Sequence, residues 1–474
     1  MRALPVVFVV ILLIAPIAGA IAPVTAGGTD ADLTSGDEVE ATDTLSAASE
    51  TTSSDGIISS DASGFTSSDV SGITSSDASL SRESTTSVSA LEGSAAPTDR
   101  SQIDEANLTF RTLSTPTDAD SRVGINTRGA NLGSSLSFAV DETDAAMETA
   151  AVVQRIENAE TNTQRQQEIL SAINQVERDE VSLNSRQTNA FDAHASGELS
   201  DRELLDELIQ ISATAREYDE RLDELSELAD ETDGFSSPTR LDELQVSLQV
   251  YEGPVRDHAL SAARGEIAAT EVHIESSEGA IVLATIDDDQ YVREVFRTDR
   301  WDRGGGEISN DAAIEATVEA YPETAALREP DAFGAGSVQR ITIPHEFGTL
   351  RTFVSGGTER VFVEHQRIDL EMFPDTESVT ESGDGFNVTV DRPYAGGPVT
   401  VTVLDDEDRE PVADVTVTKS VDGADSQTIG TTDTNGVVRT LSPADSYRVT
   451  VVDEPRVVVI DGLEPIATPR LVDE

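Results

Sequence analysis

The sequence contains no cysteine. This absence excludes disulfide bonds, cysteine-ligated zinc and iron–sulfur centres, a thiol nucleophile and a lipidated N-terminal cysteine. Lysine occurs once, at Lys419, so nearly all of the 32 basic residues are arginine. After residues 1–26 no apolar run is long enough to span a bilayer. The fold therefore has no covalent cross-link and no cysteine-bound metal to stabilise it.

Ninety acidic residues give the chain a formal net charge of −58 at pH 7. A field of this sign repels phosphate, so neither nucleic acid nor anionic lipid headgroups are expected partners. At molar salt the Debye length falls to about 3 Å, and repulsion between surface carboxylates is then screened. An acidic disordered tail is not a sufficient explanation, because Asp and Glu stay dense throughout the chain. The composition resembles that of proteins from salt-loving archaea, which implies a halophilic source.

Residues 1–26 have the pattern of a secretory signal peptide. Arg2 precedes an apolar run over residues 4–15, and small residues in the A-x-A arrangement follow within residues 18–22. The single arginine favours the general secretory route over the twin-arginine route. An uncleaved anchor is the alternative, because no charge falls between Arg2 and Asp30. We expect an extracellular or cell-surface protein, anchored at its N-terminus only if this segment is retained.

Residues 27–140 are rich in serine, threonine and aspartate, and we interpret them as a disordered stalk. So little apolar surface does not offset the entropy of ordering the chain. Ser-Ser-Asp recurs every eight residues at 59–61, 67–69 and 75–77. A short β-solenoid would also give such a period, but three copies are few.

Two sequons, at Asn107 and Asn387, match the acceptor pattern for N-glycosylation. They have this meaning only because the chain is expected to be exported. The second lies in a predicted strand whose alternate residues should face solvent.

Residues 141–265 predict a helical domain. Within residues 200–233 apolar residues follow one another at spacings of four and three, the seam of a coiled coil. Ser200 and Glu203 form a capping box that begins this helix, and the short connector before it predicts an antiparallel hairpin with the preceding helix. A third helix is kinked or divided at Gly253-Pro254. The seam, which we expect a helix of this chain or of another copy to cover, comprises Leu204, Leu208, Ile211, Ala215, Tyr218, Leu222, Leu225 and Ala229.

Residues 266–375 predict an α+β unit, because the apolar period changes from 3.6 to 2 and one helix, at 310–321, interrupts the strands. After a helix, a strand and a hairpin comes G-G-T-x-x-V-F, from Gly356 to Phe362. This order resembles the second half of the small secreted PepSY-type module, although that family usually has Thr-Gly. The resemblance implies binding to a peptide or protease partner.

Residues 384–470 predict a β-sandwich of short strands with regularly spaced turns. Three stretches, 411–415, 430–436 and 447–451, follow the order x-P-V-x-D-V … G-x-T-D-x-N-G. This order resembles the carboxypeptidase-regulatory-like, or transthyretin-like, family, whose modules are mostly accessory. The complete arrangement resembles exported haloarchaeal proteins of unknown function, which implies a location but no activity.

We expect no catalytic residues, no cofactor and no metal, and hence no enzyme. His345-Glu346 lacks a second histidine four residues on, and Gly304–Gly306 lacks the lysine of a phosphate loop. Clustered carboxylates in the acidic runs 287–289 and 405–408 leave calcium binding open as an alternative, although these runs lack the alternating ligand spacing of a calcium loop.

Two functions stay open at this point, with a metal-dependent hydrolase as a weaker third. The first is a non-enzymatic surface protein that assembles or interacts through its helices. The second is an accessory or inhibitor protein of a secreted peptidase, acting through the PepSY-like unit.

Overall fold

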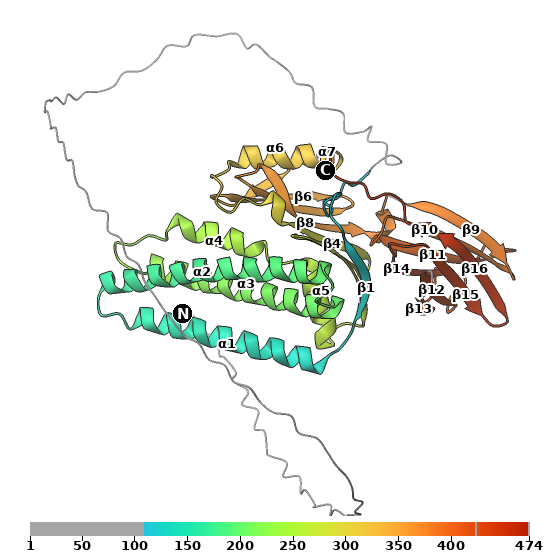
Figure 1. Cartoon of the computed structure of the whole chain (residues 1–474), viewed down its shortest axis with the longest axis horizontal. Helices are drawn as coiled ribbons and strands as arrows, with labels where there is room; N and C mark the ends of the chain where they lie inside the picture. The colour runs from blue at the N-terminus through green and yellow to red at the C-terminus, as the bar shows by residue number, and fades with distance from the viewer. Residues whose placement is uncertain (1–108, 375, 422–423, 473–474) are drawn as a thin grey trace, which may run out of the picture. The chain divides into compact units, whose positions relative to one another are not determined.

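The computed structural model describes residues 109–374, 376–421 and 424–472. The signal-like segment, the Ser-Ser-Asp repeats and the sequon at Asn107 lie outside these residues. The described chain is multidomain: a helical region, an α+β unit with an eight-stranded antiparallel sheet, and a C-terminal β-sandwich (Figure 1). Among the described helices, none combines the length and the apolar character that crossing a bilayer requires.

The helical region is built around α3. Its helices are α1 (Leu132–Glu157), α2 (Asn162–Ala195), α3 (Asp201–Asp230), α4 (Thr239–Gln249) and α5 (Pro254–Arg264). The ion pairs Arg186–Glu207 and Arg165–Glu231 join opposite ends of α2 and α3, so these two helices form the predicted antiparallel hairpin. Helices α1, α4 and α5 also pack against α3.

Local signals explain where these helices begin. At α3, the Ser200 hydroxyl accepts the N–H of Glu203, and the Glu203 carboxylate accepts the N–H of Ser200, so the predicted capping box is present. Gly253 and Pro254 divide the third predicted helix into α4 and α5. The preceding helix of the predicted hairpin is likewise two helices, because Asn158 ends α1 and the Thr161 side chain caps α2.

The seam residues of α3 face the interior. Seven of them are buried, and Tyr218 is half-buried and packs against the same core. The buried surface is wider than a two-helix seam, however, because Leu205, Ile209 and Leu228 are buried as well. Helix α3 therefore lies at the centre of a bundle and has neighbours on several sides.

The eight-stranded sheet has the order β1-β2-β3-β4-β8-β7-β6-β5. Its strands are β1 (Arg122–Arg128), β2 (Thr270–Ser277), β3 (Ala280–Asp287), β4 (Gln290–Arg297), β5 (Asp331–Phe333), β6 (Val338–His345), β7 (Gly348–Ser355) and β8 (Arg360–Asp369). The 3-10 turns η3 (Thr298–Arg300) and η4 (Leu370–Met372) follow β4 and β8.

Alternate residues of the sheet face two different layers. Ile281, Leu283 and Phe362 pack with the α1–α5 bundle, whereas Val282 and Val361 pack beneath α6 (Asn310–Ala320) and α7 (Pro322–Leu327). Figure 1 shows the sheet between these layers. This period of two is the one that the sequence predicted for residues 266–375.

The expected stalk boundary at residue 140 is wrong. Residues 122–128 form edge strand β1, which pairs antiparallel with β2, and α1 begins at Leu132. Residues 109–115 also belong to the folded chain, because they lie against its C-terminal segment. Thr112 donates its N–H to the Pro469 carbonyl at 2.8 Å, and the two chain segments run parallel there.

The β-sandwich consists of two four-stranded sheets, β14-β11-β10-β9 and β13-β12-β15-β16. It begins at residue 377, before the predicted start at 384. Its strands are β9 (Glu377–Gly383), β10 (Phe386–Arg392), β11 (Pro398–Asp405), β12 (Thr416–Val421), β13 (Gln427–Thr431), β14 (Val437–Leu441), β15 (Tyr447–Asp453) and β16 (Arg456–Leu463). Alternate valines of these strands, among them Val388, Val401 and Val449, fill the space between the sheets.

Candidate functional site

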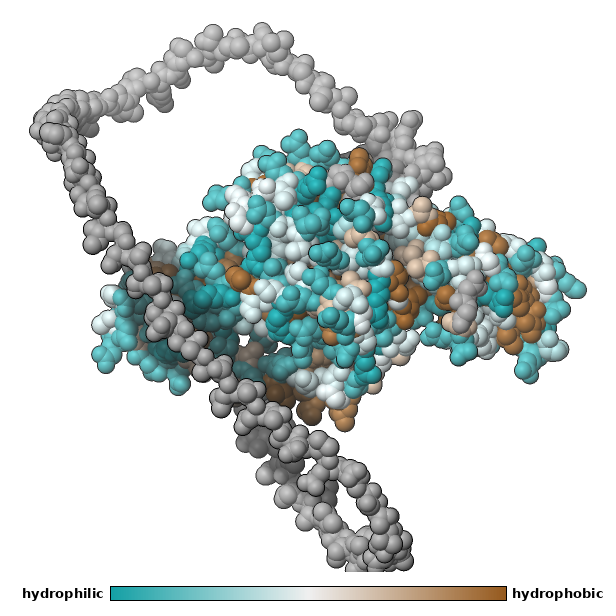
Figure 2. Space-filling view, viewed as in Figure 1, coloured by the Kyte–Doolittle hydropathy of each residue, from teal (hydrophilic) through white to brown (hydrophobic). Residues whose placement is uncertain are grey.

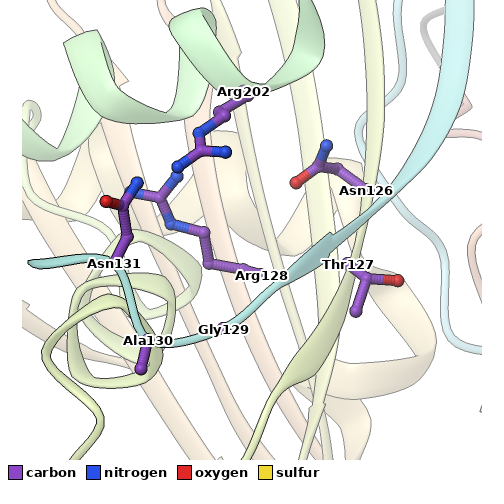
Figure 3. A pocket seen from close by; sticks show the side chains of 7 residues that line it. All are labelled: Asn126, Thr127, Arg128, Gly129, Ala130, Asn131 and Arg202. Atoms are coloured by element: carbon purple, nitrogen blue, oxygen red, sulfur yellow. The ribbon is translucent and has the colours of Figure 1, made fainter. Parts of the chain in front are cut away.

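The most distinctive pocket in this acidic chain is lined by arginine and asparagine. It lies where β1 leads into α1, beside the first turn of α3, and has a volume of about 280 Å³. Figure 3 shows Arg128 and Arg202 with their guanidinium groups toward one another. We call it the arginine pocket; its lining is Asn126, Thr127, Arg128, Gly129, Ala130, Asn131 and Arg202.

The two guanidinium groups differ in how they are compensated. Arg128 is 2% exposed and pairs with Asp206, whereas its Nε has no hydrogen-bond partner among the described residues. Arg202 is exposed and makes no ion pair within the described chain. Of the two cations, only Arg128 is thus paired with a carboxylate. Guanidinium donors in this arrangement recognise a carboxylate or another small anion.

A Ser-His-Asp set lies near this pocket but is closed to substrate. His194 Nδ1 lies 2.6 Å from the Ser276 hydroxyl, and His194 Nε2 lies 3.0 Å from Asp201. Both Ser276 and His194 are fully buried, and burial lowers the pKa of His194. The set ties α2, the start of α3 and β2 together, and no local pattern predicts it because Ser276 is 82 residues from His194.

Two ion-paired clusters fix the helices to the sheet. Glu294 on β4 accepts from Arg256 at 2.7 Å and from the N–H of Val255 at 3.0 Å. Glu180 on α2 accepts the Tyr251 hydroxyl at 2.6 Å and pairs with Arg303. Each carboxylate is buried, and it would be an uncompensated charge if its arginine moved away. Each ion pair therefore favours one orientation of the helices on the sheet.

The glycine run at 304–306 packs against another glycine turn. A Cβ on Gly305 would lie 2.3 Å from the Cα of Gly357, and one on Gly356 would lie 2.2 Å from the Gly306 carbonyl oxygen. Glycine is required here because the two backbones touch. The same contact explains the Gly-Gly pair in the stretch that resembles the PepSY-type module.

The other sequence candidates are dispersed. The ring of His345 lies tilted against that of Phe110 at the end of β6, and burial lowers the pKa of His345 to about 4. Asp287 pairs with His258 and Arg367, while Asp405 and Asp408 each accept a backbone N–H two residues on. Within the described residues no three His, Cys, Asp or Glu side chains converge as metal ligands.

Asn387 does not face solvent, contrary to the expectation for its sequon. Its side chain is 7% exposed, and its Nδ2 donates to the Ser382 hydroxyl at 2.8 Å. The amide is therefore sheltered between β9 and β10 in the folded chain and is not an accessible acceptor for a sugar.

The sole lysine joins the sandwich to the large sheet. Lys419 Nζ, on β12, donates to Glu271 of β2 at 3.2 Å, to the Thr440 hydroxyl at 2.6 Å and to the Leu441 carbonyl at 3.0 Å. Its side chain is 5% exposed. Burial lowers the pKa of Lys419, whereas the neighbouring Glu271 carboxylate acts to raise it.

Replacing this lysine should weaken the joint. We expect Lys419→Met to lower the free energy of unfolding by about 1–3 kcal/mol, because Glu271 loses its cation in a partly dry site. Denaturant unfolding in molar salt measures the loss. Arg448→Met, which removes an exposed ion pair with Asp461, is the matched control and should cost less than about 1 kcal/mol. Equal losses in the two variants would contradict this role for Lys419.

These features define a class of protein: a multidomain scaffold in which buried ion pairs fix a helical bundle and a β-sandwich to a central sheet. The chain belongs to the family described as Domain of unknown function (DUF7096), which matches residues 1–268. Residues 272–374 match Family of unknown function (DUF7094), and residues 377–460 match the Archaeal fibronectin-III type-like domain. No curated protein and no solved structure matches the chain.

The family matches refine the sequence-based resemblances. The archaeal character and the domains of unknown function are confirmed. The sandwich is confirmed as a fold, but the family that matches it is the archaeal fibronectin-III type-like domain rather than the carboxypeptidase-regulatory-like family.

Proposed function

We propose that this protein is exported by a salt-loving archaeon and acts at the cell surface as a non-enzymatic assembly or interaction module. The signal-like residues 1–26, the net charge of −58 and the archaeal fibronectin-III type-like domain support this proposal. Its partner is a protein, recognised through the helices. Contact with the membrane is limited to the N-terminal segment, where that segment is retained.

The observation that carries the proposal is an exposed apolar stripe on α1. Leu132, Leu136, Val140 and Met147 are 85%, 63%, 50% and 60% exposed. Figure 2 shows a surface that is mainly hydrophilic, with apolar atoms at its lower edge, in the region of α1, and others over the β-sandwich. Large apolar residues grouped on an acidic surface mark a site of protein interaction, because leaving them in water costs free energy.

A second function, as an accessory or inhibitor protein of a secreted peptidase, is favoured by the α6 layer. Helix α6 packs on β6, β7 and β8, next to the turn that resembles the PepSY-type module. Val318 on α6 and Phe333 on β5 are 37% and 56% exposed. A peptidase would be bound at this layer and not at α1.

Cell fractionation of the full chain in a haloarchaeal host, with mass spectrometry of its N-terminus, tests the export. We expect the protein in the surface or medium fraction with an N-terminus created by cleavage within residues 18–26. Recovery from the cytosol with residues 1–26 intact would overturn the proposal.

Surface cross-linking separates the two functions. Val140→Asp should abolish the cross-linked partner if α1 is the interaction face, whereas Val318→Asp should not. A secreted peptidase whose cross-link is lost in Val318→Asp, but kept in Val140→Asp, would favour the accessory function.

A further inference from the structure

The stripe on α1 is uncharged along its full length. At 3.6 residues per turn, Leu132, Leu136, Val140, Met147 and Gln154 lie within about one third of the helix circumference. The same face carries Ala139, Thr143, Ala146 and Ala150. No Asp, Glu, Lys or Arg occurs on this face from residue 132 to residue 154. A partner for it must itself present an apolar, uncharged surface.

Two of the acidic residues that flank the stripe are neutralised within the chain, whereas Asp141 and Asp144 are exposed and have no ion-pair partner among the described residues. Glu142 pairs with Arg264, and Glu148 pairs with Arg221 at 3.1 Å. Most of the surface of this protein would repel another copy, because each carries a charge of −58. This face is one where that repulsion is locally reduced.

We infer that the partner of the α1 stripe is α1 of a second copy, packed antiparallel about a two-fold axis. A two-fold contact requires a surface that complements itself. In a register centred between Asp141 and Glu142, Leu132 faces Ala151 of the other copy, Leu136 faces Met147, and Val140 faces Thr143. Large side chains then lie opposite small or flexible ones, the arrangement in which helices pack without voids.

The charges at the two ends of the stripe support the same register. Just beyond its C-terminal end lies Glu157, which is exposed and has no ion-pair partner among the described residues. Its N-terminal end adjoins the arginine pocket, where Arg202 is likewise uncompensated (Figure 3). The antiparallel arrangement brings Glu157 of one copy to the pocket of the other. The Glu157 carboxylate of each copy then lies beside the guanidinium groups of the other copy's arginine pocket. The two-fold axis makes this contact twice.

The size of the face predicts a weak dimer. A 26-residue helix is about 39 Å long, and one such helix pair buries less than the roughly 800 Å² per partner of a standard interface. Molar salt strengthens apolar contact and screens the remaining repulsion. The inference rests on the proposed function, since it names the partner of the proposed interaction face. Its test in solution is nevertheless independent of where the cell places the protein.

Sedimentation equilibrium of the full chain in molar salt tests the dimer. We expect a concentration-dependent dimer whose dissociation constant rises at least 30-fold in Val140→Asp. Val181→Asp on α2 is the matched control, because Val181 is 54% exposed and lies off this face; it should leave the dimer unchanged. Circular dichroism verifies that both variants fold.

A charge exchange tests the register. Glu157→Arg and Arg202→Glu should each weaken the dimer about tenfold, and the double variant should restore it, because both pairs are re-formed with reversed sign. A monomer at all concentrations would overturn the inference. A dimer whose dissociation constant is unchanged in Val140→Asp would also overturn it. The same holds if the double charge variant dimerises no better than the two single charge variants.

Discussion

Replacing Glu364 by glutamine is expected to lower the free energy of unfolding by about 3–5 kcal/mol. Glu364 lies on β8 and is fully buried. Its carboxylate pairs with Arg293, accepts the Tyr321 hydroxyl at 2.6 Å and accepts the N–H of Leu113 at 2.6 Å. Arg293 also donates to the Leu113 carbonyl at 2.7 Å. Glutamine keeps the shape but leaves the Arg293 cation buried without its anion.

Denaturant unfolding in molar salt gives the size of this effect. Glu346→Gln, on the exposed turn after β6, is the matched control, and we expect it to change stability by less than about 0.5 kcal/mol. Because Glu364 also holds Leu113, residues 109–115 should become sensitive to protease in Glu364→Gln before the remainder unfolds. A variant as stable as wild type, with this segment still protected, would show that the ion pair is not what holds it.

The local patterns of the sequence predicted the elements that depend on neighbouring residues. The spacing of Leu204, Leu208 and Ile211 placed a buried face on α3, and Ser200 with Glu203 placed its start. The apolar run of residues 280–286, within the unit for which strands were predicted, forms β3. In each case the sequence pattern lies within one or two turns of the helix, or within one strand. The burial of one face and the capping hydrogen bonds that it reflects involve only neighbouring residues.

The features that the sequence did not reveal depend on residues far apart in the chain. Strand β1 has only two large apolar residues in a polar tract, and its partner β2 begins more than 140 residues later. The arginine pocket unites residues 126–131 with Arg202, and neither part is distinctive alone. The apolar face of α1 begins within residues 27–140, where the polar composition predicted a stalk and therefore no helix.

The second large effect concerns two histidines that are buried without charge. Burial, with a smaller contribution from nearby arginines, lowers the pKa of both His273, on β2, and His365, on β8, to about 3. Neither ring nitrogen of His273 has a hydrogen-bond partner in the described structure. In the unfolded chain each histidine has the usual pKa of about 6.5. Between these two values the unfolded state binds a proton that the folded state does not.

The sign of the pH dependence follows from that difference. The stability contributed by the neutral histidines is complete above pH 6.5 and is lost as the pH falls toward 3, by up to about 1.4 kcal/mol per pH unit for each. Buried carboxyls act in the opposite direction: burial raises the pKa of Glu252 to about 7, so its protonation stabilises the fold as the pH falls. Wild-type unfolding alone would mix the two effects.

Comparison with a variant isolates the histidines. We expect the double variant His273→Gln, His365→Gln to gain about 5 kcal/mol relative to wild type between pH 6 and pH 4, because it cannot bind these protons when it unfolds. Each single variant should show about half of this change, since the carboxyls are common to all of the proteins compared. Denaturant unfolding at several pH values in molar salt measures the difference. A difference that stays constant with pH would mean that the two rings are already protonated, or remain accessible to protons, in the folded state.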